Sequence, residues 1–219
     1  MLNIGGGKFS YPGWVNLDER NGFTLSPKTV FPDGHDLIYS SHCLEHLDDE
    51  TVDRMLSESR RVGKTLVLKL PDFELVLERL KARDDGFFQK LGLNKLVRTW
   101  PRDSLEMRAA MMFCGYWTKE YGHEFLGPRN LSGYHGPPVL SDDEYRELFK
   151  QSPHEIARRL VPLAKGTLNH RNAWNRAEIK SLLERHGFTI HSEDPEEICR
   201  LPIPTIREMF DISLYVQAV

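Results

Sequence analysis

Short apolar runs alternate with turns through the first 72 residues of the chain, a pattern that few folds accept. Four of these runs are nearly continuous in their apolar residues, which is typical of strands buried on both faces of a parallel sheet. The runs are Leu2–Ile4, Trp14–Leu17, Asp36–Ser40 and Thr65–Leu70. We therefore expect an α/β protein rather than a helical bundle or a β-sandwich.

One amphipathic stretch supplies the crossover helix that neighbouring parallel strands require. It runs from Leu47 to Val62, with acidic residues near its start, Arg60 and Arg61 in its last turn, and Gly63 as a stop. Because strand, helix and strand follow one another directly, the sequence predicts a doubly wound, mostly parallel sheet of about six or seven strands.

The middle of the chain, residues 73–165, is less regular and is expected to form a helical, aromatic-rich insertion. The elements expected beyond residue 72 are three helices within the insertion, followed by one helix and two strands: Phe73–Arg83, Asp142–Lys150, Pro153–Leu163, Asn175–His186, Phe188–His191 and Ile212–Val216. The sequence has no linker and no internal repeat. We therefore predict a single domain over residues 1–219, in which residues 73–165 form a lid.

The charge balance and the cysteines exclude several classes of protein. The 219 residues include 29 Lys and Arg against 32 Asp and Glu, so no basic surface for a nucleic acid is expected. Cys43, Cys114 and Cys199 are odd in number and widely spaced, which argues against a disulfide framework or a cysteine-built zinc site. No apolar run approaches the ~20 residues of a membrane span, and the first residues lack the layout of a signal peptide. We expect a cytoplasmic protein, and its oligomeric state is left open.

Three glycines and an acidic residue follow the first two expected strands. Gly5, Gly6 and Gly7 come directly after Leu2–Ile4, and Asp18 ends the next strand. Glycines after a strand let the backbone approach a ligand, and a carboxylate at the end of the neighbouring strand accepts hydrogen bonds from both hydroxyls of a ribose. The pattern indicates a nucleoside site. The alternative is structural, with a tight glycine turn and a cap at the strand end.

A second group of polar residues follows the strand Asp36–Ser40. Ser41 and His42 come first, and Glu45 and His46 precede an acidic helix start. Open α/β sheets bind ligands at the carboxyl ends of their strands, so this group is expected to face the same crevice as the glycines. Glu45 is expected to be a cap or a salt-bridge partner rather than an acid catalyst.

Three motifs, in this order, resemble the class I S-adenosylmethionine-dependent methyltransferases, in particular the type 11 group. The chain reads LNIGGG over residues 2–7, where the family has hydrophobic-N-hydrophobic-G-x-G. It reads GWVNLD over residues 13–18 and DLIYSSHCLEHL over residues 36–47, which are similar to the family's second strand and its D-hydrophobic-I-x-x-S-H-x-L-E-H segment. The resemblance covers residues 2–72, returns at residues 170–188, and says little about residues 73–165.

The resemblance implies a Rossmann-like sheet that binds S-adenosylmethionine and passes its methyl group to a small-molecule or saccharide acceptor by in-line displacement. It implies that Gly5, Gly6 and Gly7 lie beside the methionine part of the cofactor and that Asp18 binds the ribose hydroxyls. Ser41 and His42 would flank the sulfonium. His42 is the candidate catalytic base, since a neutral imidazole accepts a hydroxyl proton near pH 7, and its alternative role is that of a structural histidine.

Some residues depart from the family's pattern. Asn3 stands where an acid often engages the cofactor, Thr24 and Leu25 stand where an Asp-Leu pair is expected, and only ten residues separate Gly7 from Asp18. These departures keep open a non-catalytic relative that uses the fold for binding or scaffolding. A nicotinamide-dependent reductase is a third hypothesis, because glycines after one strand and an acid after the next also describe its site, although the full G-x-G-x-x-G is missing.

Aromatic and histidine side chains collect in and after the insertion, where they are candidates for an acceptor site or for packing of the lid. They are Trp100, Tyr116, Trp117, Tyr121, His123, Tyr134, His135, His170 and Trp174. The histidines match no compact metal-binding spacing such as H-E-x-x-H, so no metal site is predicted.

Overall fold

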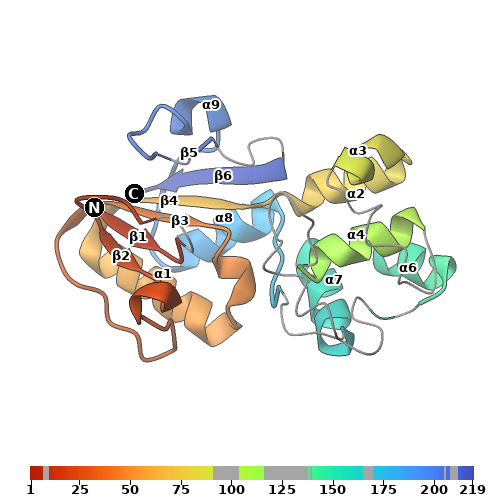
Figure 1. The fold of residues 1–219 in the computed structure, drawn as a ribbon, viewed down its shortest axis with the longest axis horizontal. Helices are drawn as coiled ribbons and strands as arrows, with labels where there is room; N and C mark the ends of the chain where they lie inside the picture. The colour runs from red at the N-terminus through yellow and green to blue at the C-terminus, as the bar shows by residue number, and fades with distance from the viewer. Residues whose placement is uncertain are drawn as a thin grey trace. The chain divides into compact units, whose positions relative to one another are not determined.

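The computed structural model describes residues 1–6, 10–90, 104–115, 138, 140–164, 170–204, 206–207 and 212–219. The chain forms two compact units, one made of Met1–Asp72 with Arg176–Val219 and the other of Phe73–Asn175 (Figure 1). We call them unit 1 and unit 2 and describe each by itself. The single domain with a lid over residues 73–165 stays a prediction.

Unit 1 contains a six-stranded sheet in the order β2-β1-β3-β4-β6-β5. Its strands are β1 Leu2–Ile4, β2 Val15–Leu17, β3 His35–Ser41, β4 Gly63–Pro71, β5 Ile190–Ser192 and β6 Ser213–Ala218. The first four pair in parallel, whereas β6 is antiparallel to both β4 and β5. The predicted fold class, an α/β protein with a mostly parallel, Rossmann-like sheet of about six or seven strands, is confirmed.

Helices cover both faces of this sheet. In Figure 1, α1 (Asp49–Val62) and α8 (Arg176–Arg185) lie on one side of it and the short α9 (Pro195–Ile198) lies on the other. Alternate side chains of the central strands point to opposite faces. On the α9 side a buried core joins Ile198 to members of β3, β4 and β6, namely Leu37, Tyr39, Val67 and Tyr215.

The crossover helix begins two residues later than the sequence predicts. The Asp48 carboxylate accepts a hydrogen bond from the Thr51 N–H, so that Asp48 is the N-cap and α1 starts at Asp49. Leu44–His46 form a separate 3-10 turn instead of leading into the helix. The predicted end is correct, because α1 stops at Val62 and Gly63 follows as its C-cap.

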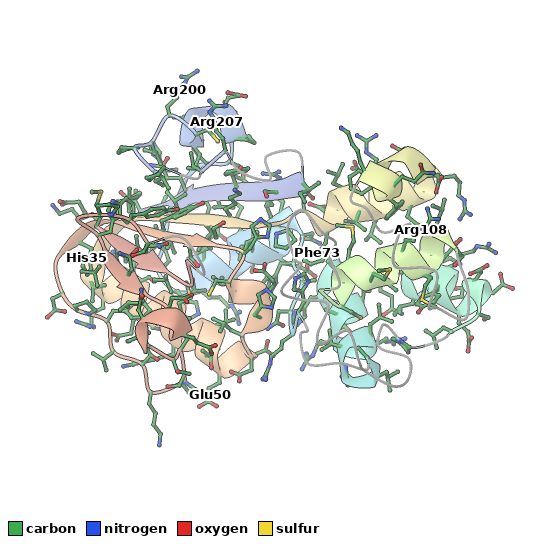
Figure 2. The ribbon with its side chains drawn as sticks, in the orientation of Figure 1. His35, Glu50, Phe73, Arg108, Arg200 and Arg207 are labelled. Atoms are coloured by element: carbon green, nitrogen blue, oxygen red, sulfur yellow. The ribbon has the colours of Figure 1, made fainter. Side chains whose placement is uncertain are left out.

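Unit 2 is helical in the part of it that the structure describes. Its helices are α2 Phe73–Lys81, α3 Asp85–Lys90, α4 Leu105–Phe113, α6 Asp142–Leu148 and α7 Pro153–Leu160, with a 3-10 turn at Val161–Leu163. Phe73 (Figure 2) stacks on Phe113 at 4.8 Å between ring centroids, and Phe113 stacks in turn on Phe149. Aromatic stacking thus joins α2 to α4 and to the residue that follows α6.

The predicted helices of unit 2 exist, but each is shorter at its carboxyl end than expected. Pro162 has no N–H to continue a helix, and α7 passes into a 3-10 turn at Val161. Helices α3 and α4 were not expected, because they lie in a stretch that looks irregular in the sequence. Within the described residues, no helix combines the length and the apolar character that crossing a bilayer requires.

Candidate functional site

The register of the parallel strands brings the ends of β1, β2 and β3 to one level of the sheet. Ile4 pairs with Leu17 on one side and with Ser40 on the other. The next residue of each strand is therefore Gly5, Asp18 or Ser41, so these three predicted site residues share one edge. It is the carboxyl edge, where open α/β sheets bind their ligands.

Gly5 occupies a position that accepts no side chain. Its φ is +66°, and its N–H donates a hydrogen bond to the Leu17 carbonyl at 2.8 Å. A Cβ at this position would lie 2.2 Å from the Cys43 sulfur. Glycine is thus required here by the close approach of Cys43, a contact within the protein itself. Gly6 is partly buried, and Gly7 lies outside the described residues.

The loop between β1 and β2 is held by Asn16, a residue that the site prediction did not include. Its Oδ1 accepts hydrogen bonds from the Tyr11 N–H at 3.0 Å and from Asn3 Nδ2 at 3.1 Å. Its Nδ2 donates to the carbonyls of Tyr11 and Trp14. Because the Asn3 amide is engaged with Asn16 and is buried, it serves to fix this loop.

Asp18 lies where β2 gives way to a 3-10 turn, Glu19–Asn21. Its carbonyl oxygen accepts hydrogen bonds from the N–H groups of Asn21 at 2.9 Å and Phe23 at 3.0 Å. These bonds turn the chain immediately after the strand and fix the backbone of Asp18 at the sheet edge. Its side chain is half-buried there.

His42 is held in a left-handed backbone conformation, with φ of +47°. Its N–H donates to the Lys69 carbonyl at 2.8 Å, which extends the β3–β4 pairing by one bond. Its ring lies between two polar partners: Nε2 is 3.0 Å from Ser213 Oγ, and Nδ1 is 3.4 Å from Glu45 Oε1. Non-glycine residues with positive φ are uncommon and persist where the surrounding structure determines them.

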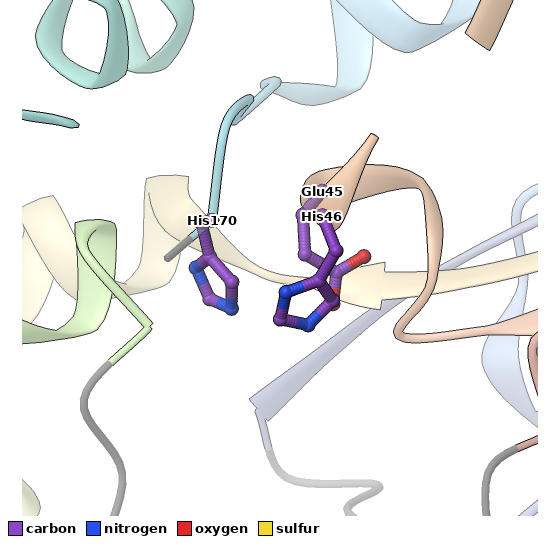
Figure 3. Close-up of side chains that lie close together, drawn as sticks. All are labelled: Glu45, His46 and His170. Atoms are coloured by element: carbon purple, nitrogen blue, oxygen red, sulfur yellow. The ribbon is translucent and has the colours of Figure 1, made fainter. Parts of the chain in front are cut away.

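Glu45 is almost fully buried, at 1% exposure. Its Oε1 also lies 3.9 Å from His46 Nε2; Figure 3 shows these two side chains. One carboxylate thus lies near the imidazoles of both His42 and His46. The expectation that Glu45 is a salt-bridge partner agrees with these distances. The alternative, a cap of the crossover helix, is wrong, because Asp48 holds that position.

Cys43 is buried, and its thiol is expected to be unreactive. Burial, and after it the nearby Glu45 carboxylate, raise the pKa of the Cys43 thiol to about 12. A thiol with such a pKa stays protonated near neutral pH and is a poor nucleophile. Its part at this edge is to fill the space that Gly5 leaves.

Two residues of the aromatic and histidine group fall within the described part of unit 2. His170, also drawn in Figure 3, is 2% exposed and packs edge-on against Phe73 at 5.8 Å between ring centroids. Trp174 is 7% exposed and lies parallel to the His154 ring. The seven residues of that group from Trp100 to His135 lie outside the described residues.

Comparisons with known proteins find similarity to solved structures. No family model matches the chain, and no curated protein matches it. A crystal structure of an S-adenosylmethionine dependent methyltransferase from Mesorhizobium loti matches with a TM-score of 0.43 and 15% identity, over 99% of this chain and 88% of that chain. Because the identity and the TM-score are this low, the function is inferred below from the residues of this chain alone.

Proposed function

We propose that the chain is an S-adenosylmethionine-dependent methyltransferase whose cofactor binds at the carboxyl edge of the unit 1 sheet. The observation that carries the proposal is the common level of Gly5, Asp18 and Ser41, set by the pairing of Ile4 with Leu17 and Ser40. A glycine turn, a carboxylate and a hydroxyl at the carboxyl edge of a parallel sheet support the proposal, because folds of this kind bind their ligands at that edge.

The donors and acceptors present fit such a cofactor. Asp18 is the acidic group at the end of β2, and it would accept hydrogen bonds from the ribose hydroxyls. The turn that starts at Gly5 would lie along the methionine part, together with Gly6 and Gly7, and Ser41 would lie beside the sulfonium with His42. When bound, the cofactor supplies a methyl group on a positively charged sulfur, which is ready for in-line transfer.

His42 is proposed as the base that removes a proton from the methyl acceptor. The Glu45 carboxylate near Nδ1 favours the tautomer that carries its proton on Nδ1, so Nε2 keeps its lone pair. At rest, Nε2 is within hydrogen-bond distance of the Ser213 hydroxyl. An acceptor hydroxyl that takes the place of this hydroxyl group would donate to the same lone pair. The acceptor is therefore proposed to be a hydroxyl of a small molecule or saccharide.

Calorimetric titration with S-adenosylmethionine and S-adenosylhomocysteine tests the cofactor site. Asp18→Asn removes the charge that binds the ribose hydroxyls and is expected to weaken binding about tenfold or more. Asp36→Asn is the matched control, since Asp36 lies near the other end of β3 and pairs with Lys64. Folded protein that binds neither compound would disprove the proposal, and equal affinities for the two variants would disprove the role of Asp18.

A test of the role of His42 requires a methyl acceptor. A panel of hydroxylated small molecules and saccharides is screened for one by measuring the release of S-adenosylhomocysteine. His42→Gln is expected to lower kcat by about 10²–10⁴, the usual contribution of a positioned base, and to leave cofactor affinity nearly unchanged. Ser213→Ala is expected to retain activity, because only the resting partner of Nε2 is removed. A His42→Gln variant as active as the parent protein would leave His42 with a structural role.

A second candidate is a non-catalytic relative that keeps the fold for binding or scaffolding. It is favoured by the engagement of Asn3 with Asn16, since an acid often occupies this position in the family that the sequence resembles. In that case Asp18→Ala would leave the cellular function intact. Fluorescence energy transfer from the protein to bound NADH would instead support the hypothesis of a nicotinamide-dependent reductase.

Membership of the type 11 group and a cytoplasmic location belong to the same proposal. The motif of residues 36–47 supports the first, and the three separate free cysteines fit a reducing compartment. The insertion is proposed to contain the acceptor site, because the motifs of the cofactor half leave residues 73–165 unassigned.

A further inference from the structure

Unit 2 contains a pocket of its own, built by helices α2, α4 and α6. Its volume is about 600 Å³, within the range of small-molecule sites. Leu77, Leu80 and the ring of Phe149 supply an apolar part of its lining. All these residues belong to one compact unit, so the pocket is a property of that unit alone.

The remaining lining of this pocket is strongly charged and mainly basic. Its basic members, on or just after α2 and α6, are Lys81, Arg83, Arg146 and Lys150, and its acidic members are Glu78 and Glu106. The lining residues thus include four positive groups and two negative ones, and Asp143 and Glu147, outside the lining, pair with Arg146 and Lys150. Arginine and lysine gathered in a concave site attract and bind anions.

Glu106 is the buried centre of this charge cluster. It is 1% exposed, and its Oε1 accepts hydrogen bonds from Arg83 Nη1 at 2.5 Å and Arg146 Nε at 3.1 Å. Its Oε2 is also buried and has no hydrogen-bond partner among the residues that the structure describes. A buried carboxylate oxygen normally accepts a hydrogen bond, so an N–H or O–H group of a ligand would satisfy this atom.

Arg83 lines the pocket and follows helix α2. Its φ is +55°, in the left-handed conformation in which glycine or asparagine usually ends a helix. The N–H groups of Arg83 and Asp84 donate to the carbonyls of Leu80 and Arg79, the two hydrogen bonds of a Schellman motif, so the positive φ belongs to the end of the helix. The guanidinium of Arg83 is half exposed while it holds Glu106, so part of it is available to a ligand.

We propose that this pocket binds a phosphorylated sugar. The phosphate would pair with the basic side chains, most directly with the exposed Lys81 and Lys150, and a sugar hydroxyl would donate to Glu106 Oε2. The partly buried Phe149 ring offers an apolar face to the C–H groups of the sugar. The proposal requires both an anion and a hydroxyl in one ligand, and it does not depend on methyl transfer.

Calorimetry on the full chain, with glucose 6-phosphate, inorganic phosphate and glucose as probes, tests the proposal. Glucose 6-phosphate is expected to bind at least about tenfold more tightly than inorganic phosphate, because its sugar hydroxyls can donate to Glu106 while its phosphate stays paired with the basic side chains. Glucose is expected not to bind. The double substitution Lys81→Gln with Lys150→Gln is expected to weaken glucose 6-phosphate binding by at least about tenfold.

Lys90→Gln is the matched control, since Lys90 is an exposed lysine of the same unit on α3, outside the pocket lining. It is expected to change the affinity less than about twofold, and circular dichroism shows that each variant is folded. The proposal is overturned if the parent protein does not bind glucose 6-phosphate, or if the double variant binds it as tightly as the parent. Equal binding of inorganic phosphate would overturn the part played by Glu106.

Discussion

The carboxyl edge of unit 1 and the pocket of unit 2 place polar groups in different ways. At the edge, strand register, the positive φ of Gly5 and His42, and the approach of Cys43 determine the positions. In the pocket, the positions depend on the buried Glu106, which pairs with two arginines from different segments of the chain. The first arrangement depends on shape and the second on charge.

This difference has a measurable consequence. Steric fit does not respond to salt, whereas ion pairs with exposed members are weakened as ionic strength rises. The edge of unit 1 is therefore expected to keep its arrangement in conditions that loosen the cluster of unit 2. The three substitutions below test this contrast, and they are ordered by the expected loss of stability.

Gly5→Ala is expected to lower the free energy of unfolding by about 3 kcal/mol, from overlap with Cys43 and from a strained φ. Gly13→Ala is the control, because Gly13 has φ of +78° and nothing lies within 4 Å of an added Cβ. Gly13→Ala is expected to lower the free energy of unfolding by about 1 kcal/mol, from backbone strain alone. Urea unfolding measures both, and adding salt should not change their difference. Equal losses would show that Cys43 yields to the new methyl group.

The strands were predictable because burial on both faces leaves continuous apolar runs, and their register follows once they are parallel. This is why Gly5, Asp18 and Ser41 could be expected at one edge from sequence alone. The contact of His42 with Ser213 could not, because 171 residues separate them and Ser213 lies on a strand that joins the sheet antiparallel. The role of Asn16 was not predicted, because an asparagine within a strand motif does not indicate which backbone groups its side chain will bind.

Unit 2 was harder to predict for a physical reason. Helix α4 is buried on nearly all sides, from Glu106 to Phe113, so it lacks the apolar and polar alternation that marks a surface helix. The charge cluster joins Arg83, Glu106 and Arg146 from three separate segments. No spacing along the chain relates these residues, and only the packing of the helices brings them together.

Glu106→Gln is expected to destabilise the protein by about 2 kcal/mol, because two arginines lose the carboxylate they share; their exposure to water keeps the loss below that of a fully buried pair. In 1 M salt the loss should shrink, unlike that of Gly5→Ala. Glu147→Gln is the control, since it breaks only the exposed pair with Lys150 and should change little. Urea unfolding at two salt concentrations measures the loss of stability. A loss that does not depend on salt would contradict an electrostatic origin of the stabilisation by Glu106.

Glu58 in unit 1 shows that this unit, too, contains a carboxylate held by an arginine. Its carboxylate accepts a hydrogen bond from the Phe31 N–H at 2.9 Å, which ties the segment before β3 to α1, and one from Arg61 Nη2 at 2.6 Å within α1 itself. The hydrogen bond from Arg61 is the main cause that holds the pKa of Glu58 below its ordinary 4.5. Charge therefore also stabilises unit 1, near the amino end of β3.

Glu58→Gln is expected to cost about 1 kcal/mol at pH 7. Because the folded pKa lies below the unfolded one, the stabilisation is fully present above pH 4.5 and is lost as the pH falls through the lowered value. The difference between parent and variant should therefore vanish in acid, as followed by urea unfolding across pH. Glu50→Gln, at an exposed position in the first turn of the same helix (Figure 2), is the control. A loss that stays constant down to low pH would mean that Glu58 acts through its shape, and the steric description would then hold for this part of unit 1 as well.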